Sequence, residues 1–281
     1  MAEFTELSRS KSHGGSVVKY RHNSDVLGCA MQFSAFLPPA PGPRPVLFWL
    51  SGLTCTEDNF IQKAGALKKA AELGLLLVCP DTSPRGLGIE GEDESWDFGT
   101  GAGFYLDATA EKWKRYRMFS YITKELPELV RTHFPVDPAR ASISGHSMGG
   151  LGSLVCALRN PGMFRSISAF APISNPIQCP WGVKAFTGYL GDNKAAWKDW
   201  DPSELAAKYE GPPISILVDQ GSEDSFLHQK QLLPEALETA VAGNDRLNLQ
   251  LRIQDGYDHS YFFIQTFIDG HLEFHARALS T

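Results

Sequence analysis

The stretch Ser142–Ser153, SISGHSMGGLGS, gives the strongest indication of the fold of this chain, because it places Ser147 in the pattern G-x-S-x-G. A candidate strand, Ala141–Ser144, precedes the motif, and a candidate helix, Met148–Arg159, follows it. A serine on a sharp turn between a strand and a helix is typical of a nucleophile elbow. Glycines two positions on either side of the serine leave room for that strained turn. With 26 glycines in the chain the pattern could arise by chance, but the flanking strand and helix favour the elbow.

Composition restricts the class of protein. The chain has 281 residues, 43% of them hydrophobic, which is enough for one large domain with a buried core. A net charge of −6 argues against a nucleic-acid partner. The polar N-terminus does not resemble a signal peptide, and no apolar run is long enough to cross a membrane. The five widely spaced cysteines do not suggest a disulfide framework, so we expect a soluble, cytoplasmic protein.

Short apolar runs alternate with helix-like segments along most of the chain. This alternation predicts a mostly parallel sheet with helices on both faces and an antiparallel N-terminal hairpin that includes Cys29–Leu37, and together with the elbow it predicts an α/β-hydrolase fold. We expect a single domain over residues 1–281, in which residues 1–15 are a poorly determined N-terminal arm. The Pro-rich stretch Pro38–Pro45 reads as a hairpin loop. The other candidate strands are Val46–Leu50, Leu75–Cys79, Ser166–Phe170, Ile214–Asp219 and Leu249–Ile253, and the other candidate helices are Lys63–Leu73, Met118–His133, Gln229–Ala242 and Tyr261–Ala278.

A serine hydroxyl needs an adjacent base to become a nucleophile, and His259 is the best candidate among eight histidines. It follows the last candidate strand in a glycine-containing loop, where an imidazole can lie above the strand ends. His146 neighbours the serine in sequence, so we expect its side chain to point elsewhere and to be structural. His271 and His275 lie four residues apart, but the stretch lacks the H-E-x-x-H order, so we predict an ordinary helix face and no metal site.

The acid that orients the imidazole is expected just after the strand Ile214–Asp219. Asp224 lies in the loop beyond that strand and is our first choice. Asp219 is the second choice, and Asp258, next to the histidine in sequence, is the weakest. The order Ser147, Asp224, His259 is the chain order of the α/β-hydrolases.

An acyl-transfer site also needs two donors for the oxyanion. We assign them to the backbone N–H groups of Met148, which follows the serine, and Leu53, which follows an early strand. Gly52 would permit the turn that directs the Leu53 N–H inward. Cys55 lies two residues further on and is either a redox-sensitive thiol or a small packed loop residue.

Several motifs together resemble one family. The chain is similar to the S-formylglutathione hydrolases, also called esterase D, over nearly its whole length apart from the first fifteen or so residues. The matching motifs are LSGLTCTEDNF (50–60), DTSPRGL (81–87), GAGFYLDAT (101–109), SGHSMGG (144–150), FAPISNP (170–176), CPWGVKAFTGYLGDN (179–193), VDQGSEDSFL (218–227) and GYDHSYFFI (256–264).

The resemblance implies hydrolysis of S-formylglutathione to glutathione and formate in formaldehyde detoxification. It implies a formyl-serine intermediate, side activity on simple carboxylic esters, no cofactor and a homodimer. The family pattern assigns the triad to Ser147, Asp224 and His259, and the oxyanion donors to Leu53 and Met148.

Three further residues are candidates for substrate binding. Trp181 and Lys184 are expected in a loop beyond a strand, and Trp96 in an acidic loop. Lys184 could pair with a glutathione carboxylate, although a solvated lysine and structural tryptophans would explain the same residues. The alternative functions are a general carboxylesterase or acyltransferase with the same machinery, and a non-catalytic binding protein on this scaffold.

Overall fold

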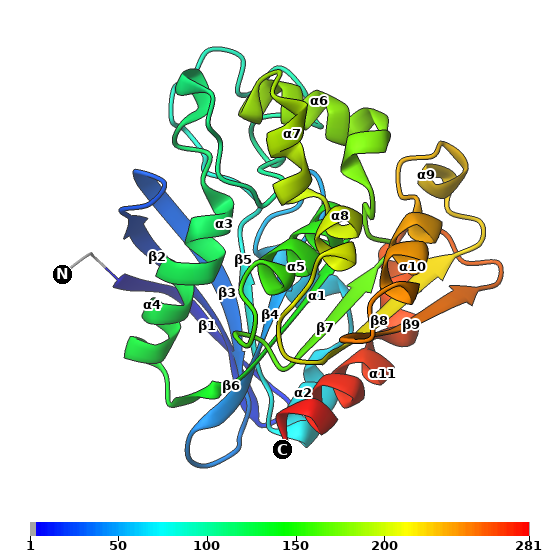
Figure 1. Cartoon of the computed structure of the whole chain (residues 1–281). Helices are drawn as coiled ribbons and strands as arrows, with labels where there is room; N and C mark the ends of the chain where they lie inside the picture. The colour runs from blue at the N-terminus through cyan, green and yellow to red at the C-terminus, as the bar shows by residue number, and fades with distance from the viewer. Residues whose placement is uncertain (1–3, 281) are drawn as a thin grey trace.

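The computed structural model describes residues 4–280, and within them nine strands form one mixed sheet in the order β1-β2-β3-β5-β4-β6-β7-β8-β9 (Figure 1). The pairs from β1 to β5 along this order are antiparallel, and those from β5 to β9 are parallel. The expected fold, a mostly parallel sheet with an antiparallel N-terminal hairpin, is confirmed. The strands are β1 (Phe4–Ser12), β2 (Gly15–Ser24), β3 (Cys29–Leu37), β4 (Arg44–Leu50), β5 (Leu76–Pro80), β6 (Val136–His146), β7 (Ser166–Phe170), β8 (Ile214–Gly221) and β9 (Leu247–Gln254).

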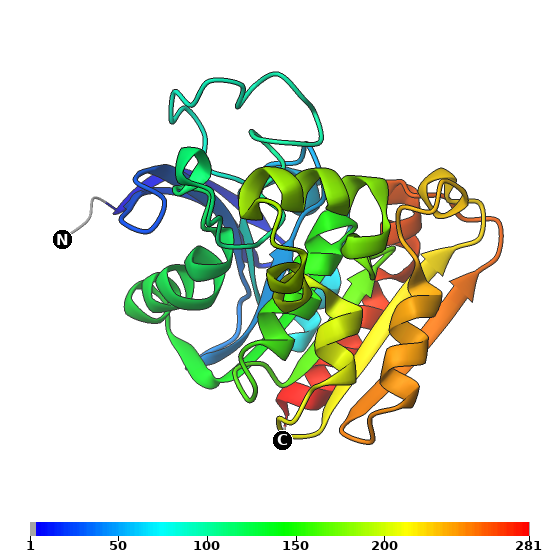
Figure 2. The same cartoon turned by 45° about the horizontal axis from the view of Figure 1, so that its top comes forward.

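Helices cover both faces of this sheet. In Figure 2, α11 lies behind the parallel strands, and α5, α8 and α10 lie in front of them. The central strands β5 and β7 are therefore buried along their whole length. The helices are α1 (Asp58–Lys63), α2 (Leu67–Leu73), α3 (Met118–Ser120), α4 (Leu126–His133), α5 (Met148–Leu158), α6 (Pro180–Leu190), α7 (Lys194–Trp197), α8 (Pro202–Ala207), α9 (Ser225–His228), α10 (Pro234–Ala242) and α11 (Tyr261–Leu279), and the shorter helical turns are Glu111–Trp113, Tyr121–Glu125, Pro176–Gln178 and Lys198–Trp200.

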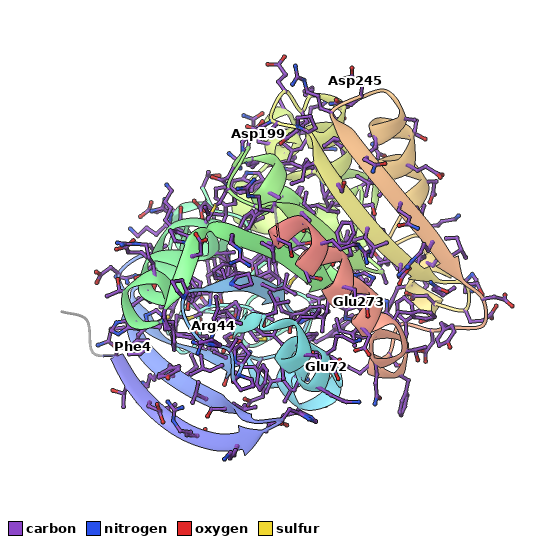
Figure 3. All side chains as sticks on the ribbon, turned by 90° about the horizontal axis from the view of Figure 1, so that it is seen from below. Phe4, Arg44, Glu72, Asp199, Asp245 and Glu273 are labelled. Atoms are coloured by element: carbon purple, nitrogen blue, oxygen red, sulfur yellow. The ribbon has the colours of Figure 1, made fainter. Side chains whose placement is uncertain are left out.

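The back face is closed by α2 and α11, which lie side by side when the molecule is seen from below (Figure 3). An ion pair of 3.0 Å between Lys69 Nζ and Glu273 Oε1 joins the two helices. Neither of them, nor any other helix within residues 4–280, combines the length and the apolar character that a membrane span requires.

The parallel register aligns the carboxyl ends of the central strands. Leu50 of β4 pairs with Gly145 of β6, and Phe170 of β7 pairs with Asp219 of β8. The loops after β4, β6, β8 and β9 therefore leave the sheet at one edge, which is where open α/β sheets place their ligands.

Four expectations on local structure are wrong. The helix expected at 63–73 is interrupted at Gly65, whose φ is +68°, so α1 and α2 are separate. The helix expected at 229–242 begins only at Pro234, because Leu233 has a left-handed φ of 50°. Pro38–Pro45 is not a hairpin loop, because β3 pairs with β5 rather than with β4. The loop expected to hold Trp181 is the helix α6, whose first turn begins at a proline.

The N-terminal arm carries more structure than the sequence suggests. Phe4–Ser12 forms β1, which pairs antiparallel with β2 at the edge of the sheet. Most of its residues are exposed, and the ring of Phe4 stacks on Tyr20 at 4.7 Å between centroids. Alternation between buried and exposed faces is weak in such an edge strand, so its sequence carries little strand signal.

Candidate active site

Ser147 lies on a strained turn between β6 and α5, with φ 58° and ψ −119°. Its N–H donates to the Phe170 carbonyl at 2.9 Å, which ties the turn to β7. A Cβ added at Gly145 would lie 2.1 Å from the Gly149 carbonyl oxygen, and one added at Gly149 would lie 1.9 Å from that of Leu50. The glycines are therefore required by close backbone contact, and the turn is the nucleophile elbow that the motif predicts.

His259 and Asp224 are joined by a hydrogen bond of 2.5 Å between Nδ1 and Oδ2. Burial raises the pKa of Asp224, but its hydrogen bond and charge interaction with His259 outweigh burial and leave this pKa below its ordinary value. Two other donors hold the carboxylate, since Phe226 N–H reaches Oδ1 at 2.8 Å and Gln220 Nε2 reaches Oδ2 at 3.2 Å. An ionised carboxylate so placed fixes the imidazole tautomer with Nδ1 protonated and leaves Nε2 free to accept a proton.

A close contact between two loops brings Asp224 and His259 together. Gly221, the last residue of β8, has no room for a side chain, because a Cβ there would lie 2.2 Å from the Tyr257 carbonyl oxygen. The same carbonyl accepts a hydrogen bond of 2.9 Å from the N–H of Glu223. The loop after β8, which carries Asp224, is thus held against the loop after β9, which carries His259.

The two other acids that the sequence left open have different partners. Asp219 is fully buried, accepts two hydrogen bonds of 2.6 Å from the Arg252 guanidinium, and contacts His271 Nε2 at 3.1 Å. Although burial raises its pKa, these donors lower the pKa to about 2. Asp258 Oδ1 accepts from the backbone N–H and hydroxyl of Ser260 at the start of α11. Of the three, only Asp224 contacts His259.

The loop after β4 lies against the elbow. A Cβ added at Gly52 would lie 3.1 Å from Ser147 Cβ, so this glycine permits the approach of Leu53 to the serine. The residue of this turn with a left-handed φ is Thr54, at 66°, whereas Gly52 does not have a positive φ. Within the described chain the Leu53 N–H has no backbone acceptor, and the Met148 N–H belongs to the first turn of α5, where no intrahelical acceptor exists. Both donors are therefore available to a ligand next to Ser147.

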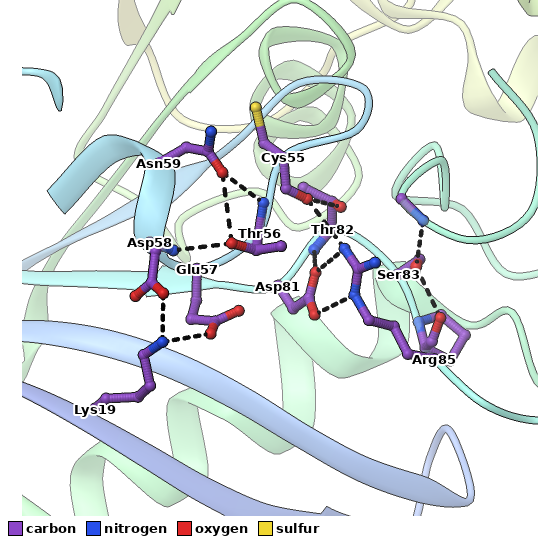
Figure 4. A network of polar contacts seen from close by, with 12 residues as sticks. Lys19, Cys55, Thr56, Glu57, Asp58, Asn59, Asp81, Thr82, Ser83 and Arg85 are labelled. Carbon is purple, nitrogen blue, oxygen red and sulfur yellow. Dashed lines mark hydrogen bonds and ion pairs between the residues drawn. The ribbon is translucent and has the colours of Figure 1, made fainter. Parts of the chain in front are cut away.

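A polar network holds the loop that carries Leu53, which would donate to an oxyanion (the oxyanion loop, residues 51–56; Figure 4). The Cys55 carbonyl accepts from the Thr82 hydroxyl at 2.5 Å and from Arg85 Nη2 at 3.2 Å. The same guanidinium is paired with Asp81 through contacts of 2.6 and 2.8 Å. Thr54 N–H donates to the Gly101 carbonyl at 2.9 Å. With its carbonyl and N–H groups anchored, the loop can hold the Leu53 N–H in one place, which electrostatic stabilisation requires.

Ser147, His259 and Leu53 line one cavity of about 300 Å³, a size that suits a small-molecule ligand. Within the described residues no hydrogen bond joins the Ser147 hydroxyl to the imidazole; in free enzymes such contacts are often long. A second, larger groove of about 560 Å³ lies between α10 and β9, but no serine, cysteine or histidine lines it.

Aromatic side chains form part of the cavity wall. Trp181 contacts the ring of Phe226 with centroids 4.6 Å apart, and Phe226 in turn contacts the His259 ring at 4.8 Å. Trp96, which is 55% exposed, meets Trp181 edge-on at 5.7 Å. The two tryptophans that the sequence suggested for substrate binding therefore lie at the cavity, Trp181 buried and Trp96 at the surface.

Lys184 has an intramolecular partner. Its ammonium group is paired with Asp97 and donates to the Ser95 hydroxyl at 2.7 Å. Burial raises the pKa of Asp97, but the ammonium outweighs this effect and lowers the pKa overall. Lys184 does not line the cavity; it fastens the loop that carries Trp96 to α6.

His146 differs from its expected position. Its ring contacts the His259 ring with centroids 4.4 Å apart and lines the cavity, so the side chain does not point elsewhere. Burial first, and then the neighbouring His259, hold the pKa of His146 well below its ordinary value. The neutral His146 imidazole thus packs directly against the His259 ring.

His271 and His275 are buried on one face of α11, and each has a protein partner. His271 contacts Asp219, and His275 bonds Ser166 Oγ through Nδ1 and Ser168 Oγ through Nε2, both at 2.8 Å. Burial holds the pKa of His275 well below its ordinary value. The pair is thus part of the packing between α11 and the sheet.

Cys55 lies in the cavity wall. Its burial raises the pKa of the thiol, so the unreactive thiol form dominates near neutral pH. Two other wall residues, Asn59 and Lys63, were not identified from the sequence. Their spacing of four residues on one helix could have indicated a shared face, but the sequence predicted a helix that begins only at Lys63.

Comparison with known proteins decides the family. A family model described as "Putative esterase" matches residues 24–274. The S-formylglutathione hydrolase of Bos taurus is 54% identical over 278 residues, which are 98% of each chain. The chain belongs to the S-formylglutathione hydrolase family. The corresponding protein of Arabidopsis thaliana is 53% identical over 281 residues, again 98% of each chain.

Solved structures agree with this family. The S-formylglutathione hydrolase of Agrobacterium tumefaciens superposes with a TM-score of 0.94 at 46% identity, covering 98% of this chain and 99% of that one. The fluorophosphonate-binding serine hydrolase F of Staphylococcus aureus has a TM-score of 0.73 at 17% identity, covering 93% of this chain and 98% of that one. The latter similarity shows a shared fold. The protein is therefore an esterase-family hydrolase with an α/β-hydrolase fold.

Proposed function

We propose that the protein hydrolyses S-formylglutathione to glutathione and formate, a step in formaldehyde detoxification, with side activity on simple carboxylic esters. The observation that carries the proposal is the Asp224–His259 pair at the cavity that Ser147 lines, in a chain more than half identical to hydrolases of this name. The strained elbow and the two free N–H groups support acyl transfer as the reaction.

The residues take these roles in the proposed mechanism. The Ser147 oxygen attacks the formyl carbon while His259 Nε2 accepts the hydroxyl proton and Asp224 stabilises the imidazolium. The N–H groups of Leu53 and Met148 bind the oxyanion. The C–S bond then breaks, the glutathione sulfur leaves with the proton from His259, and a formyl-serine ester remains. Water, activated by the same imidazole, attacks this ester and releases formate and the free serine.

The proposal is tested with a panel of acyl donors. S-formylglutathione, S-acetylglutathione, longer acyl-glutathiones and p-nitrophenyl esters of matched chain length are compared by kcat/KM. We expect the formyl thioester to be the best substrate, with activity decreasing as the acyl chain grows. A preference for long-chain esters would instead indicate a general carboxylesterase, and transfer to an added alcohol in place of water would indicate an acyltransferase.

We further propose that the protein is one domain, acts in the cytoplasm and forms a homodimer. All five cysteines are free, which is typical of proteins in reducing compartments. The homodimer is implied by the resemblance to the family. Light scattering coupled to gel filtration tests it, with an expected mass twice that of the chain; the mass of one chain would refute it.

We propose Cys55 as a redox-sensitive position. A modified sulfur in the cavity wall would occupy substrate space, although the raised pKa makes the reaction slow near neutral pH.

A further inference from the structure

One face of α1 supplies the polar part of the cavity wall. Asn59 and Lys63 both line the cavity and lie four residues apart on the helix Asp58–Lys63. Residues at this spacing are neighbours on one helix face, with Cβ atoms about 5–6 Å apart. The cavity therefore has an amide and an ammonium group side by side on one wall.

The orientation of the Asn59 amide is fixed by its own hydrogen bonds. Asn59 Oδ1 accepts from the Thr56 backbone N–H at 2.9 Å and lies 3.4 Å from the Thr56 hydroxyl. In Figure 4 the amide nitrogen points away from Thr56. Within residues 4–280 this NH₂ group has no hydrogen-bond acceptor, so both of its protons are available to a ligand.

Lys63 is an unpaired cation at the cavity. Its Nζ lies 5.8 Å from the centroid of the Tyr261 ring, which directs the side chain along the wall. No ion pair within the described residues includes Lys63, whereas Lys184 is held by Asp97. No aspartate or glutamate lines the cavity, and Lys63 is its only lysine or arginine among residues 4–280. This wall is thus locally positive in a protein whose net charge is −6.

We propose that Asn59 and Lys63 bind a carboxylate of the glutathione moiety and thereby determine which thioesters are good substrates. This inference rests on the proposed function. At neutral pH the glutathione moiety carries two carboxylates and one ammonium group, so a carboxylate lies at each end of the leaving group. A carboxylate accepts charge-assisted hydrogen bonds from an ammonium and an amide NH₂ group together, which suits these two side chains. The formyl group is common to many thioesters and cannot provide this discrimination.

The test compares S-formylglutathione with S-formyl-N-acetylcysteamine, a thioester that has no carboxylate. We expect Lys63→Met to raise KM for S-formylglutathione about 3- to 10-fold with kcat nearly unchanged, since exposed ion pairs contribute modestly. The same variant should leave kcat/KM for the uncharged thioester within about 2-fold of the parent value. Added salt should raise KM for S-formylglutathione in the parent and much less in Lys63→Met.

Two more variants complete the design. Asn59→Asp keeps the acceptor for the Thr56 N–H but replaces the NH₂ group by a charged oxygen, so KM for S-formylglutathione should rise more than for Lys63→Met. Lys68→Met removes an exposed lysine on α2 that does not line the cavity and should change neither substrate's kinetics. Thermal unfolding of each variant checks that the fold is retained.

The outcomes separate this inference from the proposed function. If Lys63→Met affects both thioesters equally, or affects neither, the carboxylate site is wrong while hydrolysis of S-formylglutathione by the parent still supports the function. If the parent hydrolyses the uncharged thioester but not S-formylglutathione, the proposed function fails, and the carboxylate site fails with it.

Discussion

Asp219, in β8, and Asp224, at the start of α9, are both buried, and changing each to asparagine should remove a different property of the enzyme. Asp224→Asn removes the charge opposite His259 and gives Nδ1 an amide as its partner. The imidazole can then adopt the wrong tautomer, and its charged form is no longer stabilised. Asp219→Asn removes the charge that Arg252 and His271 share, at a site that does not contact the base.

The expected magnitudes follow from these contacts. Loss of the orienting acid of a serine triad lowers kcat by about 10³- to 10⁴-fold, and we expect this for Asp224→Asn. A pKa lowered from 3.8 to about 2 in the buried Asp219 corresponds to about 2 kcal/mol of folding stability. Because this pKa is lowered on folding, the contribution is complete above about pH 4 and is lost as pH falls toward 2. Asp219→Asn should therefore lower Tm by about 4–8 °C at neutral pH.

The assay measures kcat for S-formylglutathione hydrolysis and Tm by circular dichroism, on both variants and the parent at the same pH. We expect Asp224→Asn to lose activity and to retain most of its Tm, and Asp219→Asn to show the opposite pattern. If Asp219→Asn were inactive while Asp224→Asn turned over near the parent rate, the assignment of the acid would be refuted.

Three further outcomes follow from single positions. Gly52→Ala places a Cβ 3.1 Å from Ser147 Cβ and should shift the oxyanion loop by a few tenths of an ångström. We therefore expect kcat to fall about 10- to 100-fold, and an unchanged kcat would show that this loop does not hold the oxyanion donor. Gly270→Ala meets no atom within 4 Å in the interior of α11, so it should stabilise the protein by about 0.5–1 kcal/mol in a urea titration, and any loss would contradict the open space seen there. Inactivation by iodoacetamide should be slow near pH 7, faster above pH 9 and absent in Cys55→Ser; equal sensitivity of the variant would exclude this thiol.

The turn at Ser147 and the position of His259 could be predicted from the sequence because both depend on local order along the chain. The strand before Ser147 and the loop that holds His259 follow from apolar runs and glycines, and the parallel register then brings their ends together. The acid was predicted less firmly. What separates Asp219 from Asp224 is an ion pair with Arg252. Arg252 lies on β9, and only the pairing of β8 with β9 brings it opposite Asp219.

Other features required tertiary contacts that a single sequence does not display. The helix α6 contains two glycines, Gly182 and Gly188, which lower its helix propensity. Tertiary packing requires them, because a Cβ at Gly182 would lie 2.1 Å from Pro176 and one at Gly188 would lie 2.3 Å from Phe98. The position of Lys63 at the cavity follows from α1, the helix that ends at this residue, whereas the sequence predicted a helix that begins there.

Ser147 is proposed to form the acyl intermediate in hydrolysis of S-formylglutathione. The most direct measurement is the rate of formate release from S-formylglutathione by the parent and by Ser147→Ala, with thermal unfolding as the control for the fold. We predict rapid release by the parent and a loss of at least about 10⁴-fold in the folded variant, because only the oxyanion donors and binding would remain. Release by the variant at a rate near that of the parent would contradict this role of Ser147.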